Sequence, residues 1–446
     1  METIVKVERI VIENLKNVAF GEIQLHVDFK HMRKANVMGL YGQNGSGKTT
    51  VVNAFELLKI LLSSAVTEEK LPPIAKHLIH IEAERAKLTF DFLVRNQCGE
   101  FFVQYHVELV RGVSRLYPVV EELHYRENAP RKRMKLLAKK DGQHIQIRTQ
   151  TVEEMKQQDK IAVMVTNQLS ERESTSFLFH KELQPMLESY LKEVEWQLIQ
   201  SLTQDFNRDL YVINNENIGF VMTKYLMPFS VYLEQSRGMI PYNLSEPALL
   251  PKPLYDTLCQ VIEQINYVLS AVIPGLKVEV REIATQLLDN GEQGVRFEFL
   301  SNRNGRVLPL RTESEGILKI IAVLSALAAA YNKPNACIVI DELDSGVFEY
   351  LLGELLKIIA EAGQGQLFFT SHNLRLLEVL TTKDLWFTTS NEQRRYIQLK
   401  GVKTLHNTRD VYLRAIQLGG QDESVYEDTK SFHIKKAFWK ARRGEE

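Results

Sequence analysis

The sequence predicts a mixed α/β fold in which an N-terminal and a C-terminal lobe enclose a mostly helical middle segment. Three observations lead to this prediction. The stretch GQNGSGKT, residues 42–49, lies between an apolar strand pattern and a helix pattern, as phosphate-binding loops do. The apolar stretch CIVI at 337–340 is followed by Asp341 and Glu342, which places two carboxylates at a strand end. Alternating apolar and polar residues between 87 and 128 predict an antiparallel β subdomain.

The length of 446 residues allows two or three domains. We expect an N-terminal lobe over 1–150, a mostly helical insertion over 151–290 and a C-terminal lobe over 291–446. The composition, 44% hydrophobic and 25% charged, is that of an ordinary soluble protein. Because the net charge is −1, any contact with nucleic acid must be local. We expect a cytoplasmic protein without a membrane span, since no signal peptide and no sufficiently long apolar run is visible and the three cysteines lie far apart.

Apolar periodicity assigns the remaining elements in order. In the N-terminal lobe, strands are expected at 5–18, 22–29 and 37–41, a helix at 50–58, and β-subdomain strands at 87–94, 99–110 and 119–128. The middle segment is mostly helical, with its clearest helices at 192–206 and 254–272, and a short strand fits at 210–213. The C-terminal lobe is expected to hold a hairpin at 295–312 turning at Asn304-Gly305, an apolar helix at 316–331, strands at 336–344 and 366–370, and a helix at 347–362.

The phosphate loop predicts a nucleoside triphosphate site. Its glycines let the backbone turn its N–H groups inward, and these groups form an anion nest with the N-terminus of the next helix. Lys48 is expected to reach the β- and γ-phosphates, and the Thr49 hydroxyl to hold Mg²⁺. The loop residues expected to contact the nucleotide are Gly42, Asn44, Gly45, Gly47, Lys48, Thr49 and Thr50.

The carboxylate pair supplies the other half of such a site. Asp341 is expected to hold the Mg²⁺ hydration shell, and Glu342 to polarise the attacking water. Lys48 and Asp341 are 293 positions apart (341 minus 48), a wider separation than a compact AAA+ module or a small GTPase has. The guanine-reading Asn-Lys-x-Asp is missing, since the stretch at 332–335 reads NKPN. We therefore expect ATP.

Two further stretches have polar residues at the expected ends of elements. Ser314 and Gly316 lie at the start of the apolar helix, where a hydroxyl and a bare backbone form an anion site; the alternative is that Ser314 simply caps its own helix. His372 follows the strand at 366–370 and is expected to contact the γ-phosphate or the attacking water. The alternative for His372 is a structural role.

In this order, the motifs resemble those of the ABC/SMC-like P-loop ATPases, the class of RecF, the SMC proteins and the overcoming-lysogenization-defect (OLD) proteins. The resemblance covers roughly residues 1–110 and 295–400 and implies the ATPase head of that class, a mixed sheet with an antiparallel β subdomain. Gly42–Thr49 looks like Walker A, and Ile338–Glu342 looks like Walker B. Thr312–Ile317 looks like the signature motif, Leu343-Asp344-Ser345 resembles the D-loop, which places Asp344 at ATP, and His372 resembles the switch histidine.

Within this class, DELDSGVFEYLLGELL and FFTSHNLRLLEVL look most like the stand-alone AAA-family ATPases of bacterial abortive-infection and antiphage loci. Two departures are visible. The signature reads Glu-Ser-Glu-Gly rather than Leu-Ser-Gly-Gly-Gln. The residues after His372 are too few for the C-terminal Toprim domain of OLD-type nucleases.

The resemblance implies a homodimer or higher homo-oligomer in which the signature of one subunit completes the ATP site of another. We expect slow, Mg²⁺-dependent ATP hydrolysis, and a sensor or switch in antiphage defence that controls a separate effector such as a nuclease. Two alternatives remain open. One is a RecF-like DNA-repair or chromosome-maintenance ATPase that binds DNA, and the other is a self-contained OLD-like nuclease with an unrecognised active site.

Two basic clusters offer local contacts for DNA or RNA phosphates, or are solvated surface. The first lies at 126–140 and the second in the C-terminal tail, where Phe438 and Trp439 could stack on bases. The basic residues are Arg126, Arg131, Lys132, Arg133, Lys135, Lys139 and Lys140 in the first cluster and Lys435, Lys436, Lys440, Arg442 and Arg443 in the second.

Overall fold

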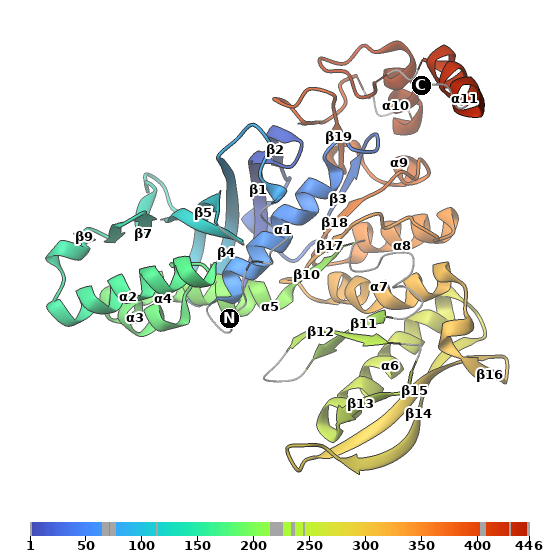
Figure 1. The fold of residues 1–446 in the computed structure, drawn as a ribbon, viewed down its shortest axis with the longest axis horizontal. Helices are drawn as coiled ribbons and strands as arrows, with labels where there is room; N and C mark the ends of the chain where they lie inside the picture. The colour runs from blue at the N-terminus through green and yellow to red at the C-terminus, as the bar shows by residue number, and fades with distance from the viewer. Residues whose placement is uncertain are drawn as a thin grey trace.

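A six-stranded, largely parallel sheet forms the centre of the molecule (Figure 1). In this computed structural model its strands lie in the order β10-β17-β18-β3-β19-β20, and only β20 runs antiparallel to its neighbour. The structure describes residues 2–64, 71, 77–112, 115–214, 226–232, 237–243, 246–401, 407–427 and 430–443. The strands are β3 (Asn36–Tyr41), β10 (Leu210–Ile213), β17 (Cys337–Ile340), β18 (Gln366–Thr370), β19 (Leu385–Thr388) and β20 (Tyr396–Ile397).

The three strands that carry the predicted motifs, β3, β17 and β18, are buried along their whole length. Their uninterrupted apolar runs are typical of parallel strands covered on both faces. The strands predicted at 37–41 and 366–370 are thus confirmed. The strand predicted at 336–344 is confirmed over its apolar part, and it ends at Ile340, where a turn begins at Asp341. So is the short strand predicted at 210–213, which pairs with β17.

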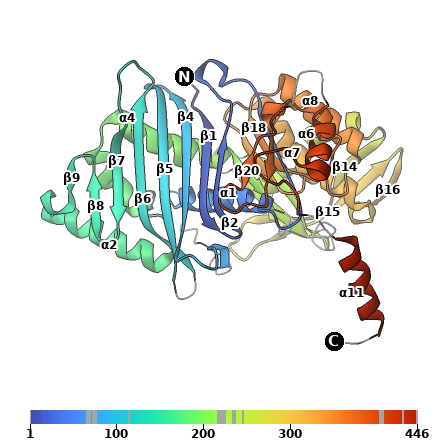
Figure 2. The ribbon, with the colours of Figure 1, turned by 90° about the horizontal axis from the view of Figure 1, so that it is seen from above.

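An eight-stranded antiparallel sheet forms the β subdomain, and Figure 2 shows its strands side by side. Helix α1 (Lys48–Ser63) lies between the two sheets, because its Phe55 ring packs on Phe90 of the β subdomain at 5.6 Å and on Phe368 of β18 at 5.0 Å between ring centroids. The predicted β subdomain is confirmed. Its strands are β1 (Ile4–Leu15), β2 (Val18–Gln24), β4 (Arg85–Asn96), β5 (Gly99–Arg111), β6 (Leu116–Glu127), β7 (Lys135–Asp141), β8 (His144–Ile147) and β9 (Gln150–Thr151).

The second strand differs from the prediction, which placed it at 22–29. Asn14 and Lys16 have φ of 55° and 51°, so the chain reverses directly after β1 and β2 begins at Val18. Residues 29–31 form a 3₁₀ turn whose N-cap is Asp28. The predicted span thus combined the end of β2 with this turn.

The middle segment, 151–290, contains helices as expected but is not one helical insertion. Its first helices pack with α1 and the β subdomain in one apolar core, β10 joins the central sheet, and its last strands belong to another sheet. The helix predicted at 192–206 is a continuous helical run with a π-helical part. The elements are α2 (Gln157–Glu173), α3 (Gln184–Tyr190), α4 (Glu193–Gln200), the π-helix Ser201–Phe206, α5 (Asn207–Asp209), β11 (Leu226–Tyr232) and β12 (Arg237–Asn243).

A small sheet and two long helices form the lower part of Figure 1. The hairpin β15–β16 turns at Asn304-Gly305, both with positive φ, as predicted. Helix α7 (Glu315–Asn332) contributes to two apolar cores, one with the central sheet and one with α6, which explains why it is apolar on all sides. The other elements are α6 (Lys252–Val272), β13 (Ala248–Pro251), β14 (Leu276–Leu287), β15 (Gln293–Arg303) and β16 (Arg306–Pro309).

By length and composition, α7 is the one helix among the described residues that could cross a membrane. Two thirds of its apolar window, 67%, are buried inside the molecule. A helix packed in this way between two cores is a core helix of the fold.

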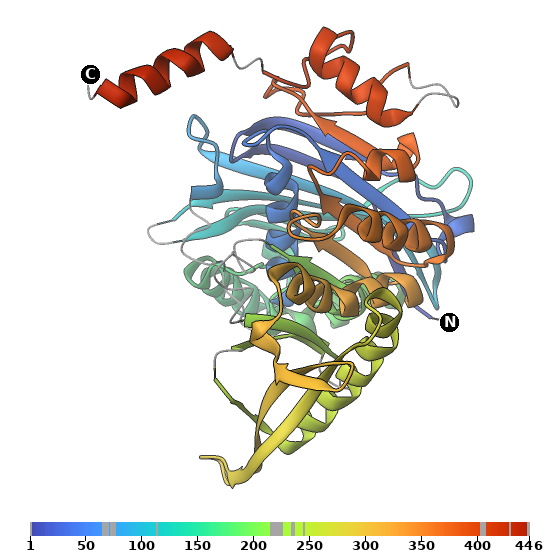
Figure 3. The same ribbon diagram turned by 90° about the vertical axis from the view of Figure 1, so that its right-hand side faces the viewer.

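The remaining α-helices of the described residues are α8 (Glu349–Ala362) and α9 (Leu376–Val379), which alternate with the last strands of the central sheet, and α10 (Thr408–Leu418) and α11 (Ser431–Arg443), which follow it. Figure 3 shows α11 projecting away from the body of the molecule. Its side chains Phe432, Phe438 and Trp439 are 71%, 74% and 51% exposed. The side chains of Arg442 and Arg443 lie outside the described residues.

Candidate nucleotide site

The predicted site residues meet at one edge of the central sheet. Strands β3, β17 and β18 run parallel and adjacent, in the order β17-β18-β3. The residues after each strand therefore come together at the carboxyl edge, where open α/β sheets bind ligands. These residues are the phosphate loop after β3, Asp341 and Glu342 after β17, and Ser371 and His372 after β18.

The phosphate loop has the backbone that its glycines predict. Gly42, Gly45 and Gly47 have φ of 152°, 76° and 95°, a region that residues with side chains rarely adopt. Gly42 also has no room for a side chain, because a Cβ atom there would lie 1.6 Å from the Thr388 hydroxyl oxygen. Gly47 is the N-cap of α1 and leads directly into Lys48.

Lys48 lies inside the loop. Its side chain is buried, and its ammonium group donates to the main-chain oxygens of Gly42 at 2.8 Å and Gln43 at 2.9 Å. Burial lowers the pKa of Lys48, and the carboxylates of Asp341, Glu342 and Asp344 oppose this shift. The lysine is therefore within electrostatic reach of all three carboxylates.

One hydroxyl contacts both Asp341, the predicted metal ligand, and Glu342, the predicted catalytic base. Thr370, at the end of β18, donates its hydroxyl to Asp341 at 2.5 Å and accepts the main-chain N–H of Glu342 at 2.7 Å. Asp341 is buried, whereas Glu342 is half-buried and has a φ of 45°. A left-handed non-glycine residue costs about 1–2 kcal/mol, and such strain occurs mainly at functional sites.

His372 and Asp344 face each other across the same edge. The main-chain N–H of His372 donates to the Asp344 carboxylate at 3.1 Å. Burial lowers the pKa of His372, and the neighbouring Lys48 lowers it further, while Asp344, Glu342 and Asp341 oppose the shift. The imidazole is thus favoured in its neutral form close to the loop lysine.

Within one chain, Ser314 and Gly316 make their described contacts away from the phosphate loop. Ser314 is the N-cap of α7 and accepts the Ile317 N–H at 3.4 Å, which is the helix-cap alternative. A Cβ atom at Gly316 would lie 1.9 Å from the main-chain oxygen of Gly346. The start of α7 therefore packs against the turn after Glu342, and no described contact brings Ser314 to the phosphate loop of its own chain.

Sequence reasoning missed Lys319, one turn further along α7. Its side chain is buried, and its ammonium group donates to the main-chain oxygen of Glu342. Burial lowers its pKa, and Asp344, Glu342 and Asp341 oppose the shift. A lysine within an apolar helix was the available signal, because an unpaired charge is rarely buried.

The β19–β20 hairpin was also missed, and it holds the phosphate loop from outside. The hydroxyls of Thr388 and Ser46 are 2.6 Å apart. The buried Tyr396 hydroxyl donates to the main-chain oxygen of Gly47 at 2.8 Å. No sequence pattern marks these contacts, because they join residues more than 340 positions apart.

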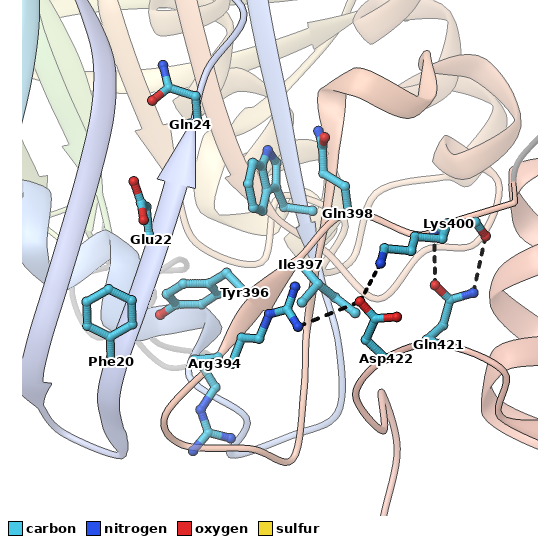
Figure 4. A pocket seen from close by; sticks show the side chains of 12 residues that line it. Phe20, Glu22, Gln24, Arg394, Tyr396, Ile397, Gln398, Lys400, Gln421 and Asp422 are labelled. Carbon is cyan, nitrogen blue, oxygen red and sulfur yellow. Dashed lines mark hydrogen bonds and ion pairs between the residues drawn. The ribbon is translucent and has the colours of Figure 1, made fainter.

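Arg395 precedes Tyr396 and lines two cavities. It donates to the main-chain oxygens of Thr389 at 2.7 Å and Asn17 at 2.6 Å, so it ties the hairpin to the turn after β1. The larger cavity, about 360 Å³, lies between β2 and β20 and is shown in Figure 4, where Lys400 and Asp422 form an ion pair. The smaller, about 220 Å³, borders the phosphate loop.

The donor set fits Mg²⁺ held together with a nucleotide. Among the described residues, no group of three or more His, Cys, Asp or Glu side chains could hold a metal ion alone. Mg²⁺ usually takes one or two protein ligands and completes its shell with phosphates and water. The Thr49 hydroxyl and the Asp341 carboxylate are of this kind.

Most side chains of the first basic cluster form ion pairs or ring contacts within the protein. Lys132 pairs with Glu127 at 2.8 Å and Lys139 with Glu122 at 2.8 Å. Lys140 is buried beside Glu171 at 3.2 Å. Arg126 stacks on the Phe102 ring, 3.6 Å from its centroid. In the tail helix, in contrast, the described basic side chains Lys435, Lys436 and Lys440 and the aromatic side chains are exposed.

Solved structures of SMC heads resemble the chain only distantly. An SMC head bound to the C-winged helix domain of ScpA has 11% identity and a TM-score of 0.44, covering 88% of this chain and 98% of that one. The SMC head domain from Thermotoga maritima has 13% identity and a TM-score of 0.38, with coverage of 89% and 99%. RecF with ATP has 12% identity and a TM-score of 0.31, with coverage of 83% and 94%. No curated protein matches significantly.

Two sequence families match the chain. The family described as "AAA domain" matches residues 9–218, which include the phosphate loop. The family described as "AAA domain, putative AbiEii toxin, Type IV TA system" matches residues 143–378, which include Ser314, Asp341, Glu342 and His372. This second match spans more than half of the chain. The chain therefore belongs to the AbiEii-type AAA family and is an ABC/SMC-like P-loop ATPase.

Proposed function

We propose that this protein is an ATP-driven switch in which Mg-ATP joins two copies of the chain and hydrolysis releases them. The observation that carries the proposal is the meeting of Lys48, Asp341, Glu342 and His372 at one sheet edge, where parallel strands β17, β18 and β3 end side by side. The carboxylates act on the pKa of Lys48, and Lys48 in turn acts on the pKa of His372. Phosphate-binding donors, a metal ligand and a base at one place are the components of ATP hydrolysis.

The residues have the following proposed roles. Lys48 leaves its loop carbonyls to bind the β- and γ-phosphates, and the glycine backbone N–H groups hold the phosphate oxygens. Mg²⁺, when bound through Thr49 and Asp341, neutralises charge on the phosphates. Glu342 accepts a proton from the attacking water. The neutral imidazole of His372 orients that water or the γ-phosphate.

Ser314 and Gly316 are proposed to act in trans. In one chain Ser314 caps its own helix, and no described contact joins it to the phosphate loop of that chain. Presented by a second copy, this helix end would add an anion site for the γ-phosphate. Asp344 lies in the turn after Walker B, whose Gly346 packs against Gly316 at the start of α7, and would lie at the same interface.

The biological role that we propose is cytoplasmic antiphage defence by abortive infection, with the ATP-bound dimer controlling a separate effector such as a nuclease. The support is the family match to a description that names a toxin of a type IV TA system.

One observation favours a second candidate, a RecF-like DNA-binding ATPase. Lys435, Lys436 and Lys440 are exposed beside exposed aromatic rings on α11, a combination that suits nucleic acid. The RecF-like candidate would be favoured by DNA binding that requires ATP, weakens as the salt concentration rises, and is lost when α11 is deleted.

The mass in solution of Glu342→Gln, with and without Mg-ATP, tests the switch. We expect a monomer that becomes a dimer with Mg-ATP, because the variant binds ATP but cannot hydrolyse it. Lys48→Ala is the control that should not bind ATP. Ser314→Arg should bind ATP and stay monomeric. A Ser314→Arg protein that dimerises normally would contradict the proposed role of the signature.

A further inference from the structure

The cavity beside the phosphate loop is closed by residues from both ends of the chain. One wall is the loop itself, and a second is Asn17 in the turn after β1. The other two are the loop between β19 and β20 and the C-terminal segment, by which we mean Gln421–Glu427. The residues that line it are Asn17, Gln43, Asn44, Gly45, Ser46, Thr389, Ser390, Glu392, Arg395, Val425, Tyr426 and Glu427.

The C-terminal segment is held in place by packing and by hydrogen bonds. Val425 is only 3% exposed and belongs to the core of the central sheet. The Ser390 N–H donates to the Ser424 carbonyl at 2.8 Å, and the Asn391 amide donates to Glu423 at 3.0 Å. Further along, the Glu427 N–H donates to the Gln43 side-chain oxygen at 3.1 Å. The segment is therefore fastened to the hairpin on one side and to the phosphate loop on the other.

The charges divide the region into two parts. The phosphate loop and Lys48 attract anions, whereas Glu392 and Glu427 add two carboxylates to the cavity against the one guanidinium of Arg395, which lies 3.7 Å from Glu392. These carboxylates repel phosphate but accept hydrogen bonds from hydroxyl and amino groups. The part of a nucleotide that carries such groups without charge is the nucleoside.

A buried donor also points to a ligand. Arg395 is 4% exposed, and its Nε–H has no hydrogen-bond partner among the described residues. Buried donors are almost always paired in folded proteins. Arg395 lines the cavity and its stem passes Gly47, since a Cβ atom there would lie 3.4 Å from the Arg395 Cγ. A ligand acceptor at this wall would satisfy the donor.

The size agrees with part of a nucleotide. The cavity of about 220 Å³ corresponds to roughly seven water molecules at about 30 Å³ each. That space suits a purine ring and a portion of its ribose. The half-buried Tyr426 supplies an aromatic ring, and aromatic rings stack well on bases.

We propose that this cavity receives the nucleoside of the nucleotide whose phosphates the loop binds, with Tyr426 packed against the base. The proposal rests on the proposed function and adds to it a site for the base. It makes the C-terminal segment part of the nucleotide site, although the segment lies more than 370 positions after the phosphate loop.

Calorimetric titration of the full chain with Mg-ATP and with Mg-tripolyphosphate tests the proposal, because tripolyphosphate has no nucleoside. Wild type should bind ATP more tightly than tripolyphosphate. Tyr426→Ala should weaken ATP binding about 10-fold and leave tripolyphosphate binding within about twofold. Tyr426→Phe, which keeps the ring, should bind ATP as wild type does. Tyr267→Ala, at a tyrosine that is 82% exposed on α6, is the control.

A second variant keeps the test decisive if Tyr426→Ala does not fold. Ser390→Phe fills the cavity from the hairpin wall, and the same selective loss of ATP binding is expected. Unchanged ATP affinity in both variants would overturn the nucleoside site, as would an equal loss of ATP and tripolyphosphate binding. Wild type that binds both ligands, but ATP no more tightly than tripolyphosphate, would overturn the nucleoside site and leave the proposed function standing. Wild type that binds neither ligand would overturn the proposed function as well.

Discussion

Hydroxyl groups fix the geometry of the candidate site at the scale of single residues. Thr370 joins Asp341 to the backbone of Glu342, and Tyr396 holds the main chain of Gly47. Both hydroxyls are neutral, and each makes a hydrogen bond at a buried position that water would otherwise have to supply. A bond of this kind contributes about 0.5–1.5 kcal/mol net, and losing it leaves a buried partner unsatisfied. Neither residue belongs to a recognisable motif.

Tyr396→Phe removes one hydroxyl and leaves the Gly47 carbonyl without its donor. We expect the free energy of unfolding to fall by about 1–3 kcal/mol and the Kd for Mg-ATP to rise, because the phosphate loop is held less firmly. Denaturant unfolding and calorimetry measure the two effects. Tyr412→Phe is the matched control, since Tyr412 is buried against Phe387 of β19 and makes no described bond to the phosphate loop. Equal effects of the two substitutions would argue against a positioning role for Tyr396.

Helix α7 shows how one element serves both stability and the site. Its apolar residues enter two cores, Lys319 reaches the turn after β17, and Gly316 allows the start of the helix to approach Gly346. Any shift at this approach moves the turn that contains Glu342. The bare backbone of Gly316 is therefore required by packing within one chain, whatever role it has toward a second copy.

Gly316→Ala tests this close approach. Because the added Cβ would lie 1.9 Å from a main-chain oxygen, we expect a loss of about 1–3 kcal/mol in the free energy of unfolding. Gly353→Ala on α8 is the control, because its nearest neighbour is a Val379 methyl carbon at an ordinary 3.5 Å and alanine favours helix over glycine. A thermal melt of both variants gives the comparison. Equal stability of Gly316→Ala and wild type would show that the two backbones separate easily.

At the scale of the whole molecule, β1 joins the two sheets. Its main chain donates from Val5 to Asn335 at 2.8 Å and from Val7 to Gln366 at 2.7 Å. Between them, the buried Lys6 donates to the Gln364 carbonyl at 2.6 Å. Burial lowers the pKa of Lys6 to about 7, and Cys337 opposes this shift. A buried ammonium thus lies where the β subdomain meets the central sheet.

This lysine predicts a pH dependence of stability. Between pH 7 and about 10.5 the unfolded chain keeps the Lys6 proton and the folded chain releases it, so stability rises with pH by up to about 1.4 kcal/mol per unit. Lys6→Met removes the titrating group and should stabilise the protein at pH 7 while flattening this rise. Denaturant unfolding from pH 7 to 9.5 measures the slope. A wild-type slope that persists in Lys6→Met would assign it to other groups.

The sequence by itself determined the fold class, the central strands and the phosphate loop, because these depend on local patterns. Glycines at fixed spacing, apolar runs of strand length and carboxylates after a strand are visible along the chain. It did not determine the true start of β2, the division of the middle segment or the contacts of Ser314, because turn geometry and packing decide these.

Only the tertiary structure decided what surrounds the phosphate loop. Tyr396, Thr388 and the C-terminal segment reach it from the far end of the chain. Lys6 looks like an ordinary surface lysine until its burial is known, and the partner of Lys319, the main-chain oxygen of Glu342, is visible only in the structure. Such contacts arise where the chain folds back on itself, and no local pattern of residues specifies them.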